Sequence, residues 1–391
     1  MRIGIDYTAA VQQGAGIGRY TRQLVRALLE LDTHNEYVLL AAAAGSGLPW
    51  KGPAGRTSGF DRSTLYGVSP GHVRTITLPV SERLLTILWH RLRLPLWVEW
   101  IAGPLDVFHS PDFVLPPVRR ARTVLTVHDL SFVRVPECAD PGLRSYLQRV
   151  VPASARRADI VLADSECTKA DVVELLGVDV SRVVVVYPGV EPRFQRVQDR
   201  QALDAVRQRY NLPDHFALGL GTLQPRKNLG RLIEAYAGVR EELGSELHLV
   251  IAGGAGWMYE SVFRRVAELG LQNLVSFPGY IADEDLPTLY SLADLFVFPS
   301  LYEGFGLPVL EAMACGTPVV TSAVSSLPEV AGDAALLVDP LDTQALAEAM
   351  RRALDDTRLR SEMVQKGLEQ ARRFTWAVSA RQLMEIYHRL G

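Results

Sequence analysis

Residues 294–322, DLFVFPSLYEGFGLPVLEAMACGTPVVTS, contain the pattern that decides the fold. The apolar run LFVF near the start and the run PVV near the end have the composition of buried strands. Between them the chain is expected to become helical near Pro308, because proline is favoured in the first turn of a helix. A buried strand, a helix and a second buried strand in succession are typical of a parallel sheet that helices cover on both faces.

The same alternation recurs along the whole chain. The strand-like runs are RIGID, EYVLLAAAA, HVRTITLP, DVFHS, TVLTVHD, DIVLADS and RVVVVYPGV in the first half, and FALGLGT, LHLVIAGG, LVSFPGY, DLFVFPS, TPVVTS and AALLVDP in the second. At 391 residues the chain exceeds the usual size of a single core. We therefore predict an α/β fold of two doubly wound, Rossmann-like domains that meet near YPGVEPRFQRVQDR, and a long loop in the Gly-, Pro- and Ser-rich residues 45–70.

Composition excludes several classes of protein. The chain is 48% hydrophobic and 22% charged with a formal net charge of −3, so nothing favours binding to nucleic acid. Its three cysteines have no metal-ligand spacing and indicate a reducing compartment rather than a disulfide framework. The start MRIGID is strand-like rather than a signal region, and no apolar run approaches the roughly 20 residues of a membrane-spanning helix. These features predict a cytoplasmic protein.

A glycine-rich loop, GAGIGRY, follows the first predicted strand at residues 14–20. A dinucleotide-binding loop is disfavoured, because seven residues separate it from RIGID and the G-x-G-x-x-G spacing is not met. Glycines that open a helix still allow backbone amides, at Gly16 and Gly18, to approach a phosphate or a sugar. The alternative is a plain tight turn.

Two adjacent cations, Arg226 and Lys227, lie in a loop between a predicted strand and a helix. Ligands bind at the carboxyl ends of parallel strands, so these side chains are placed to bind a diphosphate and to stabilise the charge that grows on it as it leaves. A solvated cationic loop is the alternative. The acidic residues 283–285 resemble a divalent-metal motif, but their place before a helical pattern favours capping of that helix.

Glu303 and Glu311 flank the turn Gly304–Phe305–Gly306–Leu307. A glutamate near the start of the helix can accept two hydrogen bonds from the 2′- and 3′-hydroxyls of a ribose, and Glu303 would face the other end of the same ligand. The pair therefore indicates two contacts to a nucleotide-sugar. The alternative, an acidic N-cap cluster on a buried helix, leaves the two permissive glycines unexplained.

At these residues the sequence strongly resembles the retaining glycosyltransferases of family 4. EGFGLPVLE matches the E-x7-E motif of that family, residues 277–322 resemble its donor-binding half, and GIGRYTRQL and VHD are similar to its N-terminal signatures. The resemblance implies the GT-B fold, in which two Rossmann-like domains face an interdomain cleft. Residues 1–192 would bind the acceptor, residues 193–373 would bind the nucleotide-sugar donor, and residues 374–391 would form a helix that crosses back to the N-terminal domain.

The resemblance also implies roles for individual residues. His128, Glu303, Arg226 and Lys227 would be catalytic: His128 and Glu303 would contact the transferred sugar, and the two cations would contact the diphosphate. The donor-binding residues would further include Gly16, Gly18, Thr222, Tyr280, Ile281, Gly304, Phe305, Gly306, Leu307 and Glu311. Tyr280 and Ile281 would line the base pocket, and Glu311 would bind the ribose. The family often has arginine where this chain has Thr222, and Arg226 is expected to replace that charge.

The resemblance implies a metal-independent transfer with retention at the anomeric carbon and no cofactor. GTLQPRKNLGRLIEAY resembles the mannosyltransferase-like branch, so we expect mannose from GDP-mannose, with UDP-glucose as the competing donor. A glycan or lipid-linked acceptor is expected. A nucleotide-sugar epimerase is disfavoured by the E-x7-E block, and a non-catalytic nucleotide-sugar-binding protein by the presence of both His128 and Glu303.

Residues 81–100, SERLLTILWHRLRLPLWVEW, admit two interpretations. Tryptophans and arginines suit an amphipathic helix on a membrane that carries a lipid-linked acceptor, which leaves a peripheral membrane contact open. Packing of Leu84, Leu88, Leu92 and Trp89 on the N-terminal sheet is favoured instead, because Pro95 limits the length of the helix.

Overall fold

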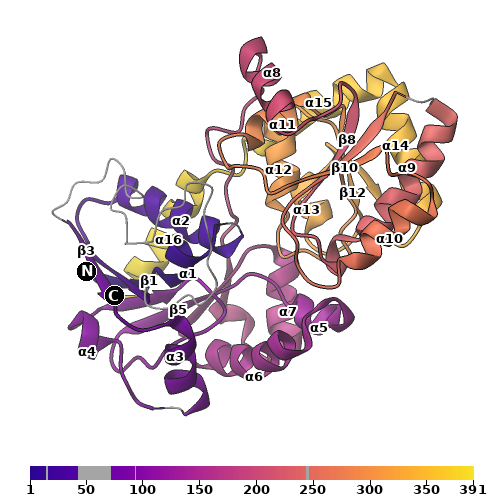
Figure 1. Cartoon of the computed structure of the whole chain (residues 1–391). Coiled ribbons are helices and arrows are strands. Elements are labelled where there is room, and N and C mark those ends of the chain that lie inside the picture. Colours follow the sequence, from indigo (N-terminus) through magenta and orange to yellow (C-terminus); the bar gives the residue numbers. More distant parts are fainter. Residues whose placement is uncertain (15, 43–71, 93, 244–245) are drawn as a thin grey trace. The chain divides into compact units, whose positions relative to one another are not determined.

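The computed structural model describes residues 1–14, 16–42, 72–92, 94–243 and 246–391. These form two compact units (Figure 1). Unit 1 contains Met1–Leu130, Ser145–Gly189 and Thr375–Gly391, and unit 2 contains Ser131–Arg144 and Val190–Phe374. Relative to the predicted division, the short segment Ser131–Arg144 groups with unit 2. The predicted loop at residues 45–70 lies outside the described residues.

Unit 1 is built on a parallel sheet whose strand order, over the described residues, is β3-β2-β1-β4-β5-β6-β7. The strands are β1 (Arg2–Asp6), β2 (Glu36–Ala42), β3 (Val73–Leu78), β4 (Val107–Ser110), β5 (Arg122–Val127), β6 (Ile160–Ala163) and β7 (Val183–Val185). Every residue of β4 and of β6 is buried, as expected for strands covered on both faces. The order reverses between β1 and β4, so the loops after these strands diverge at the carboxyl edge of the sheet.

The C-terminal helix belongs to unit 1. The helical elements of this unit are α1 (Thr8–Gln12), α2 (Ile17–Leu31), α3 (Glu82–Thr86), the π-helical turn η3 (Ile87–Arg91), α4 (Glu99–Ala102), most of α6 (Pro141–Arg157), α7 (Glu166–Leu176), the 3-10 turn η5 (Val180–Arg182) and α16 (Trp376–Leu390). Figure 1 shows α16, in yellow, beside α2, in indigo. Trp376, Leu383 and Tyr387 of α16 share one buried core with Tyr20 and Leu24 of α2.

Unit 2 repeats the architecture with the strand order, among the described residues, β10-β9-β8-β11-β12-β13. Its strands are β8 (Phe216–Leu220), β9 (His248–Ala252), β10 (Val275–Gly279), β11 (Leu295–Phe298), β12 (Val319–Ser322) and β13 (Leu336–Val338). Its helical elements are α5 (Ser131–Arg134), η4 (Pro136–Cys138), α8 (Arg200–Arg209), η6 (Pro225–Lys227), α9 (Leu229–Leu243), α10 (Glu260–Glu268), α11 (Leu286–Leu292), α12 (Leu307–Ala314), α13 (Leu327–Ala331), α14 (Thr343–Asp355) and α15 (Thr357–Ala371). The strand–helix–strand unit predicted from residues 294–322 is present as β11, α12 and β12, and the two strands pair in parallel.

The packing predicted for residues 81–100 is wrong in two positions. Leu84 and Leu92 are 42% and 59% exposed, whereas Leu88 and Trp89 are half-buried. The π-helical turn η3 follows α3 directly and takes more residues per turn than an α-helix, so residues four apart no longer share one face. No helix among the described residues is both long and apolar enough to span a membrane.

Candidate functional site

The loop before α12 is shaped by a glycine. Gly306 is the N-cap residue of α12 with φ of 107°, and a Cβ atom there would lie 2.7 Å from Leu327 Cδ2. Only glycine fits this position without strain. Pro308 lies in the first turn, as the sequence predicts, and no side chain caps the helix. The alternative interpretation of an acidic N-cap cluster is therefore wrong.

The predicted catalytic residues of unit 2 lie together. Glu303 Oε2 is 2.7 Å from Arg226 Nη1, and Glu303 Oε1 is 2.6 Å from Lys227 Nζ. The loops that carry them are joined by two further hydrogen bonds: Leu301 N donates to the Arg226 carbonyl (2.9 Å), and Arg226 Nη1 donates to the Tyr302 carbonyl (2.6 Å). Because β8 and β11 are neighbours in the sheet, residues 76 positions apart meet at its carboxyl edge.

Two cations set the charge state of Glu303. Burial by itself would raise the pKa of Glu303, but Arg226 and Lys227 outweigh it and lower that pKa to about 2. The carboxylate is therefore ionised at neutral pH, and Lys227 also lies 4.5 Å from the centroid of the Phe298 ring. Arg226 and Lys227 both contact the Glu303 carboxylate, and two cations held at the carboxyl edge of the sheet suit an anionic ligand.

Glu311 lies one turn inside α12 and is almost fully buried. It is 1% exposed, and its Oε2 accepts a hydrogen bond from the Tyr290 hydroxyl at 2.9 Å. Burial and the neighbouring Glu311 raise the pKa of the Cys315 thiol, which lies at the end of the same helix. In this structure the Glu311 carboxylate is therefore buried and hydrogen-bonded to Tyr290.

The remaining donor-binding residues predicted in unit 2 differ in exposure. Thr222 is exposed, Tyr280 is 45% exposed, and Ile281 is buried. Gly304, Phe305 and Gly306 are buried, and Leu307 is half-buried. Thr222 lies beyond β8 on the same loop as Arg226 and adds no charge, so Arg226 supplies the second cation of this loop.

The acidic residues 283–285 lie directly before α11, as predicted, but they do not cap it by a side-chain hydrogen bond. Asp285 occupies the N-cap position, but its side chain makes no capping hydrogen bond. Instead, Asp285 Oδ2 accepts hydrogen bonds from Arg209 Nη1 (2.6 Å) and from the Tyr210 hydroxyl (2.8 Å), which tie α8 to the start of α11. Among the described residues, no group of three His, Cys, Asp or Glu side chains is arranged to hold a metal ion.

In unit 1, the predicted glycines form the start of α2. Gly16 is its exposed N-cap residue. Gly18 is buried, and a Cβ atom there would lie 2.1 Å from the Gln13 carbonyl oxygen and 2.6 Å from that of Ala9. Close packing on α1 is therefore a sufficient reason for Gly18, and Gly16 is the better candidate for a ligand contact.

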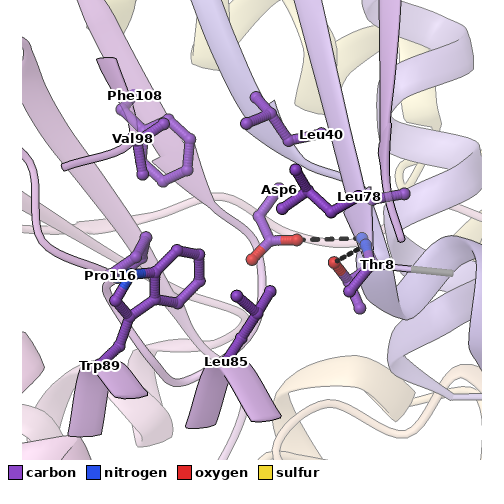
Figure 2. Close-up of a pocket in the computed structure, with 11 residues that line it drawn as sticks. Asp6, Thr8, Leu40, Leu78, Leu85, Trp89, Val98, Phe108 and Pro116 are labelled. Carbon is purple, nitrogen blue, oxygen red and sulfur yellow. Dashed lines mark hydrogen bonds between the residues drawn. The ribbon is translucent and has the colours of Figure 1, made fainter. Parts of the chain in front are cut away.

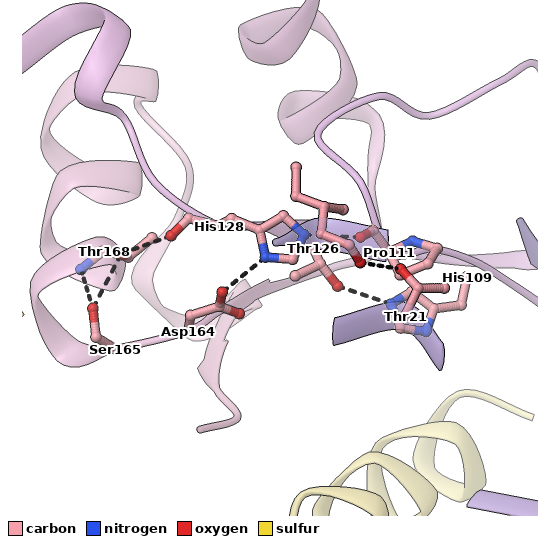
Figure 3. Close-up of polar contacts among 9 residues, drawn as sticks. Thr21, His109, Pro111, Thr126, His128, Asp164, Ser165 and Thr168 are labelled. Carbon is pink, nitrogen blue, oxygen red and sulfur yellow. Dashed lines mark hydrogen bonds and ion pairs between the residues drawn. The ribbon is translucent and has the colours of Figure 1, made fainter. Parts of the chain in front are cut away.

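His128 follows β5 and is held from both sides (Figure 3). Its Nδ1 lies 2.7 Å from Asp164 Oδ2, and its Nε2 lies 2.9 Å from the Pro111 carbonyl oxygen. Burial by itself would lower the pKa of His128, but the Asp164 carboxylate outweighs it and raises that pKa to about 9. The ring is therefore an imidazolium at neutral pH and donates from both nitrogens. The rings of Tyr20 and Phe113 meet it edge to face at centroid distances of 4.7 and 5.5 Å.

Sequence reasoning missed Asp164 and a second buried histidine, His109. His109 Nδ1 lies 2.7 Å from the Tyr387 hydroxyl of α16, and its Nε2 lies 2.9 Å from Thr126 Oγ1. Burial lowers the pKa of His109 to about 3, so this ring is neutral. The sequence holds a partial signal for Asp164, because this residue follows the strand-like run DIVLA just as His128 follows TVLTV, but only the strand order of the structure brings the two residues together.

A small pocket of about 20 Å³ lies at the carboxyl end of β1 (Figure 2). Asp6 faces it, and the other walls are mainly apolar, with Trp89 and Leu85 across from the carboxylate. The Thr8 amide donates to Asp6 Oδ1 at 3.0 Å. Burial raises the pKa of Asp6, an effect that the hydrogen bonds from Thr8 oppose. The sequence analysis did not single out this carboxylate.

Two family models match the two halves of the chain. The family model described as "Glycosyltransferase Family 4" matches residues 14–194, and the one described as "Glycosyl transferases group 1" matches residues 204–388. The O-antigen chain mannosyltransferase B of Escherichia coli is 32% identical over 375 residues, which cover 95% of each chain.

Solved structures share the whole fold. The sucrose-phosphate synthase of Thermosynechococcus elongatus superposes with a TM-score of 0.78 at 25% identity, covering 100% of this chain and 99% of the other. The Anabaena protein HepE, in complex with UDP and glucose, has a TM-score of 0.74 at 20% identity and covers 98% of both chains. Two Rossmann-like units with this topology define the GT-B class of glycosyltransferases.

Within that class, the chain belongs to glycosyltransferase family 4. It is a glycosyltransferase whose similar relatives include mannosyltransferases. The fold class and the family predicted from the sequence are thereby confirmed. The ligand contacts expected of the individual residues stay predictions.

Proposed function

We propose that this chain transfers mannose from GDP-mannose to a glycan or lipid-linked acceptor, with retention at the anomeric carbon and without a bound metal ion. The observation that carries the proposal is a cluster of three residues: Arg226 and Lys227 in η6, after β8, and Glu303 in the loop between β11 and α12. The full-length similarity to an O-antigen chain mannosyltransferase supports mannose as the transferred sugar.

Arg226 and Lys227 supply the positive charge that transfer from a nucleoside diphosphate requires. Their nitrogen atoms lie within 2.7 Å of one carboxylate, so both are held in place before a donor arrives. A diphosphate that binds there is stabilised as its negative charge grows, because the charges that meet it need no reorganisation. Glu303, ionised at neutral pH, accepts hydrogen bonds from hydroxyls of the sugar.

The chemical step is a front-face substitution. The acceptor oxygen forms a bond to the anomeric carbon on the face from which the diphosphate leaves, and the bond between that carbon and the diphosphate oxygen breaks. The acceptor proton passes to the departing diphosphate. His128 donates a hydrogen bond to the transferred sugar, for which its imidazolium form is suited.

A donor panel tests the proposal. GDP-mannose, GDP-glucose, UDP-glucose and UDP-galactose are each offered with a mannose-terminated acceptor, with and without EDTA, and the products are read by mass and by the anomeric coupling constant. We expect a hexose adduct from GDP-mannose, an α-linkage, and no effect of EDTA. Transfer from UDP-glucose alone would show that the donor is UDP-glucose and not GDP-mannose. A β-linkage would refute retention. Activity that EDTA abolishes and magnesium restores would refute metal independence.

We further propose that unit 1 contacts an anionic membrane surface. Leu84, Leu92, Leu94 and Trp100 are 42%, 59%, 38% and 61% exposed. The Arg119 guanidinium lies 5.0 Å from the centroid of the Trp97 ring, which in turn contacts the Trp100 ring, so positive charge lies close to one of these exposed apolar side chains. Flotation with vesicles that contain anionic lipid tests this contact. Co-flotation that Trp100→Ala abolishes would support it, and absence of co-flotation would refute it.

A further inference from the structure

Within the described part of the chain, the carboxylate of Asp164 is hydrogen-bonded to one group, the ring of His128. Asp164 is 5% exposed and His128 is 8% exposed, and the bond between Oδ2 and Nδ1 is 2.7 Å long. Asp164 Oδ1 is buried and has no hydrogen-bond partner among the described residues. A buried carboxylate that keeps its charge needs a partner, so the pairing with His128 decides the state of both groups.

The backbone around Asp164 is fixed by its neighbours (Figure 3). Asp164 follows the last residue of β6, and the next residue, Ser165, caps α7 by accepting a hydrogen bond from the Thr168 amide at 3.0 Å. Thr168 Oγ1 in turn donates to the His128 carbonyl at 3.3 Å. The strand β6, the Ser165 cap and the hydrogen bond from Thr168 thus fix the position of Asp164 relative to the His128 backbone.

We infer that Asp164 is a positioning residue for glycosyl transfer, which holds the His128 ring so that the N–H at Nε2 points to the oxygen of the transferred sugar. The inference rests on the proposed function of His128. The present acceptor of that N–H is a neutral backbone carbonyl, that of Pro111, which an oxygen of the substrate can replace. With Nδ1 bound to Asp164, the ring cannot turn to present its other nitrogen.

Several charged and titratable groups near the His128 ring influence its protonation. Asp164 and Asp112 favour the protonated ring, whereas the ring of His109, which also interacts with His128, is neutral. The charge of Asp129 raises the pKa of Asp164, and the ring of Tyr20 packs edge to face with the His128 ring. Of these, only Asp164 is hydrogen-bonded to the ring, so its removal should have the largest effect on protonation.

The experiment compares Asp164→Asn with Asp159→Asn. Asp159 lies at the opposite end of β6, and its carboxylate accepts hydrogen bonds from Thr123 N and Thr123 Oγ1 at 2.8 Å each. Both variants lose a structural carboxylate, but only one loses the partner of His128. Two quantities are measured: the titration of the His128 ring by long-range proton–nitrogen NMR, assigned with His128→Asn, and the pH profile of kcat.

We expect the wild-type ring to titrate near pH 9 and the Asp164→Asn ring to titrate lower, toward the ordinary value of 6.5. The alkaline limb of the kcat profile, where kcat falls as the pH rises, should shift to lower pH together with the pKa of the ring. This shift reduces kcat at pH 8 on the order of 10- to 100-fold. Asp164→Glu should restore part of the limb. Asp159→Asn should lower the melting temperature and leave the profile in place.

Three results would overturn the inference. One is a wild-type His128 that titrates near 6.5, which needs no variant and no substrate. Another is an Asp164→Asn protein in which kcat is reduced by the same factor at every pH and the titration of the His128 ring is unchanged. The third is a shift of the ring without any shift of the limb. If instead no donor supports transfer, the proposed function fails, while the ring titration still reports the pairing.

Discussion

Lys227 Nζ and Glu303 Oε1 lie 2.6 Å apart, although the two residues follow different strands of the sheet in unit 2. Arg226 holds the second oxygen of the same carboxylate. The paired carboxylate keeps both cations at the loop ends, where the strands of a parallel sheet present their ligand-binding edge.

The first prediction concerns these two cations. Arg226→Ala and Lys227→Ala should each lower kcat about 10²- to 10³-fold, because each removes a charge that stabilises the departing diphosphate. Arg264→Ala, an exposed arginine on α10, is the matched control and should leave kcat unchanged. Steady-state kinetics with saturating donor measure the effect. Equal rates for all three variants would show that the cluster does not act on the leaving group.

The second prediction concerns the ribose. Glu311→Gln should weaken binding of the nucleotide-sugar by about 1.5–3 kcal/mol, the usual worth of a hydrogen bond to a charged group. Tyr290→Phe, which removes the hydroxyl that donates to Glu311 Oε2, should affect affinity less. Calorimetry on folded protein measures both. An unchanged affinity in Glu311→Gln, with the fold intact, would contradict the assignment of Glu311.

The third prediction is a stability profile with two histidine-dependent limbs. The pKa of His128 is raised from 6.5 to about 9, so its contribution is complete below pH 6.5 and is lost as the pH rises through about 9. The pKa of His109 is lowered from 6.5 to about 3, so its contribution is complete above pH 6.5 and is lost as the pH falls through about 3.

Melting temperatures measured from pH 3 to pH 10 check this profile. His128→Asn should flatten the alkaline limb, and His109→Asn should flatten the acid limb. The exposed His388 on α16 provides the control, and His388→Asn should leave both limbs in place. Limbs that persist in the first two variants would assign the pH dependence to other groups.

The sequence predicted the fold well because strands buried on both faces of a sheet have a nearly continuous apolar composition. It also located the cluster around Glu303, because glycine, proline and paired charges follow strand ends there. It failed at residues 81–100, where the spacing of Leu84, Leu88 and Leu92 suggests one helical face. The π-helical turn at η3 breaks that face, and nothing in the local composition signals it.

Asp164 and His109 were missed for a different reason. The pairing of Val127 with Ala163 places His128 and Asp164, one residue further along each strand, next to one another. Side-chain pairs of this kind depend on strand order and register, which a single sequence does not state. His109 depends further on Tyr387, 278 residues away on a helix whose packing partner cannot be derived from local periodicity.

The fourth prediction concerns that pair. Tyr387→Phe keeps the buried ring but removes the hydroxyl bound to His109 Nδ1, so it leaves a buried polar atom without this partner. We expect a loss of about 1–3 kcal/mol in the free energy of unfolding. Ser379→Ala, which removes a different buried hydroxyl of α16, leaves His109 intact and serves as the comparison. Denaturant titration measures both, and a free energy of unfolding that Tyr387→Phe leaves unchanged would contradict a stabilising bond between Tyr387 and His109.

The last prediction concerns α16 as a whole. Trp376, Leu383 and Tyr387 are at most 7% exposed in the core of unit 1, and fully burying one such side chain stabilises a protein by about 1.5–3 kcal/mol. The loss of several of them together approaches the 5–15 kcal/mol by which a domain is typically stable. A chain that ends at Phe374 should therefore lose the cooperative unfolding of unit 1 and all transfer, while unit 2, which α16 does not join, retains nucleotide binding. Hydrogen exchange of the two units, with calorimetry of GDP binding, distinguishes these effects. A truncated protein that transfers sugar at the normal rate would refute the role of the helix, and one that no longer binds GDP would show that unit 2 depends on it.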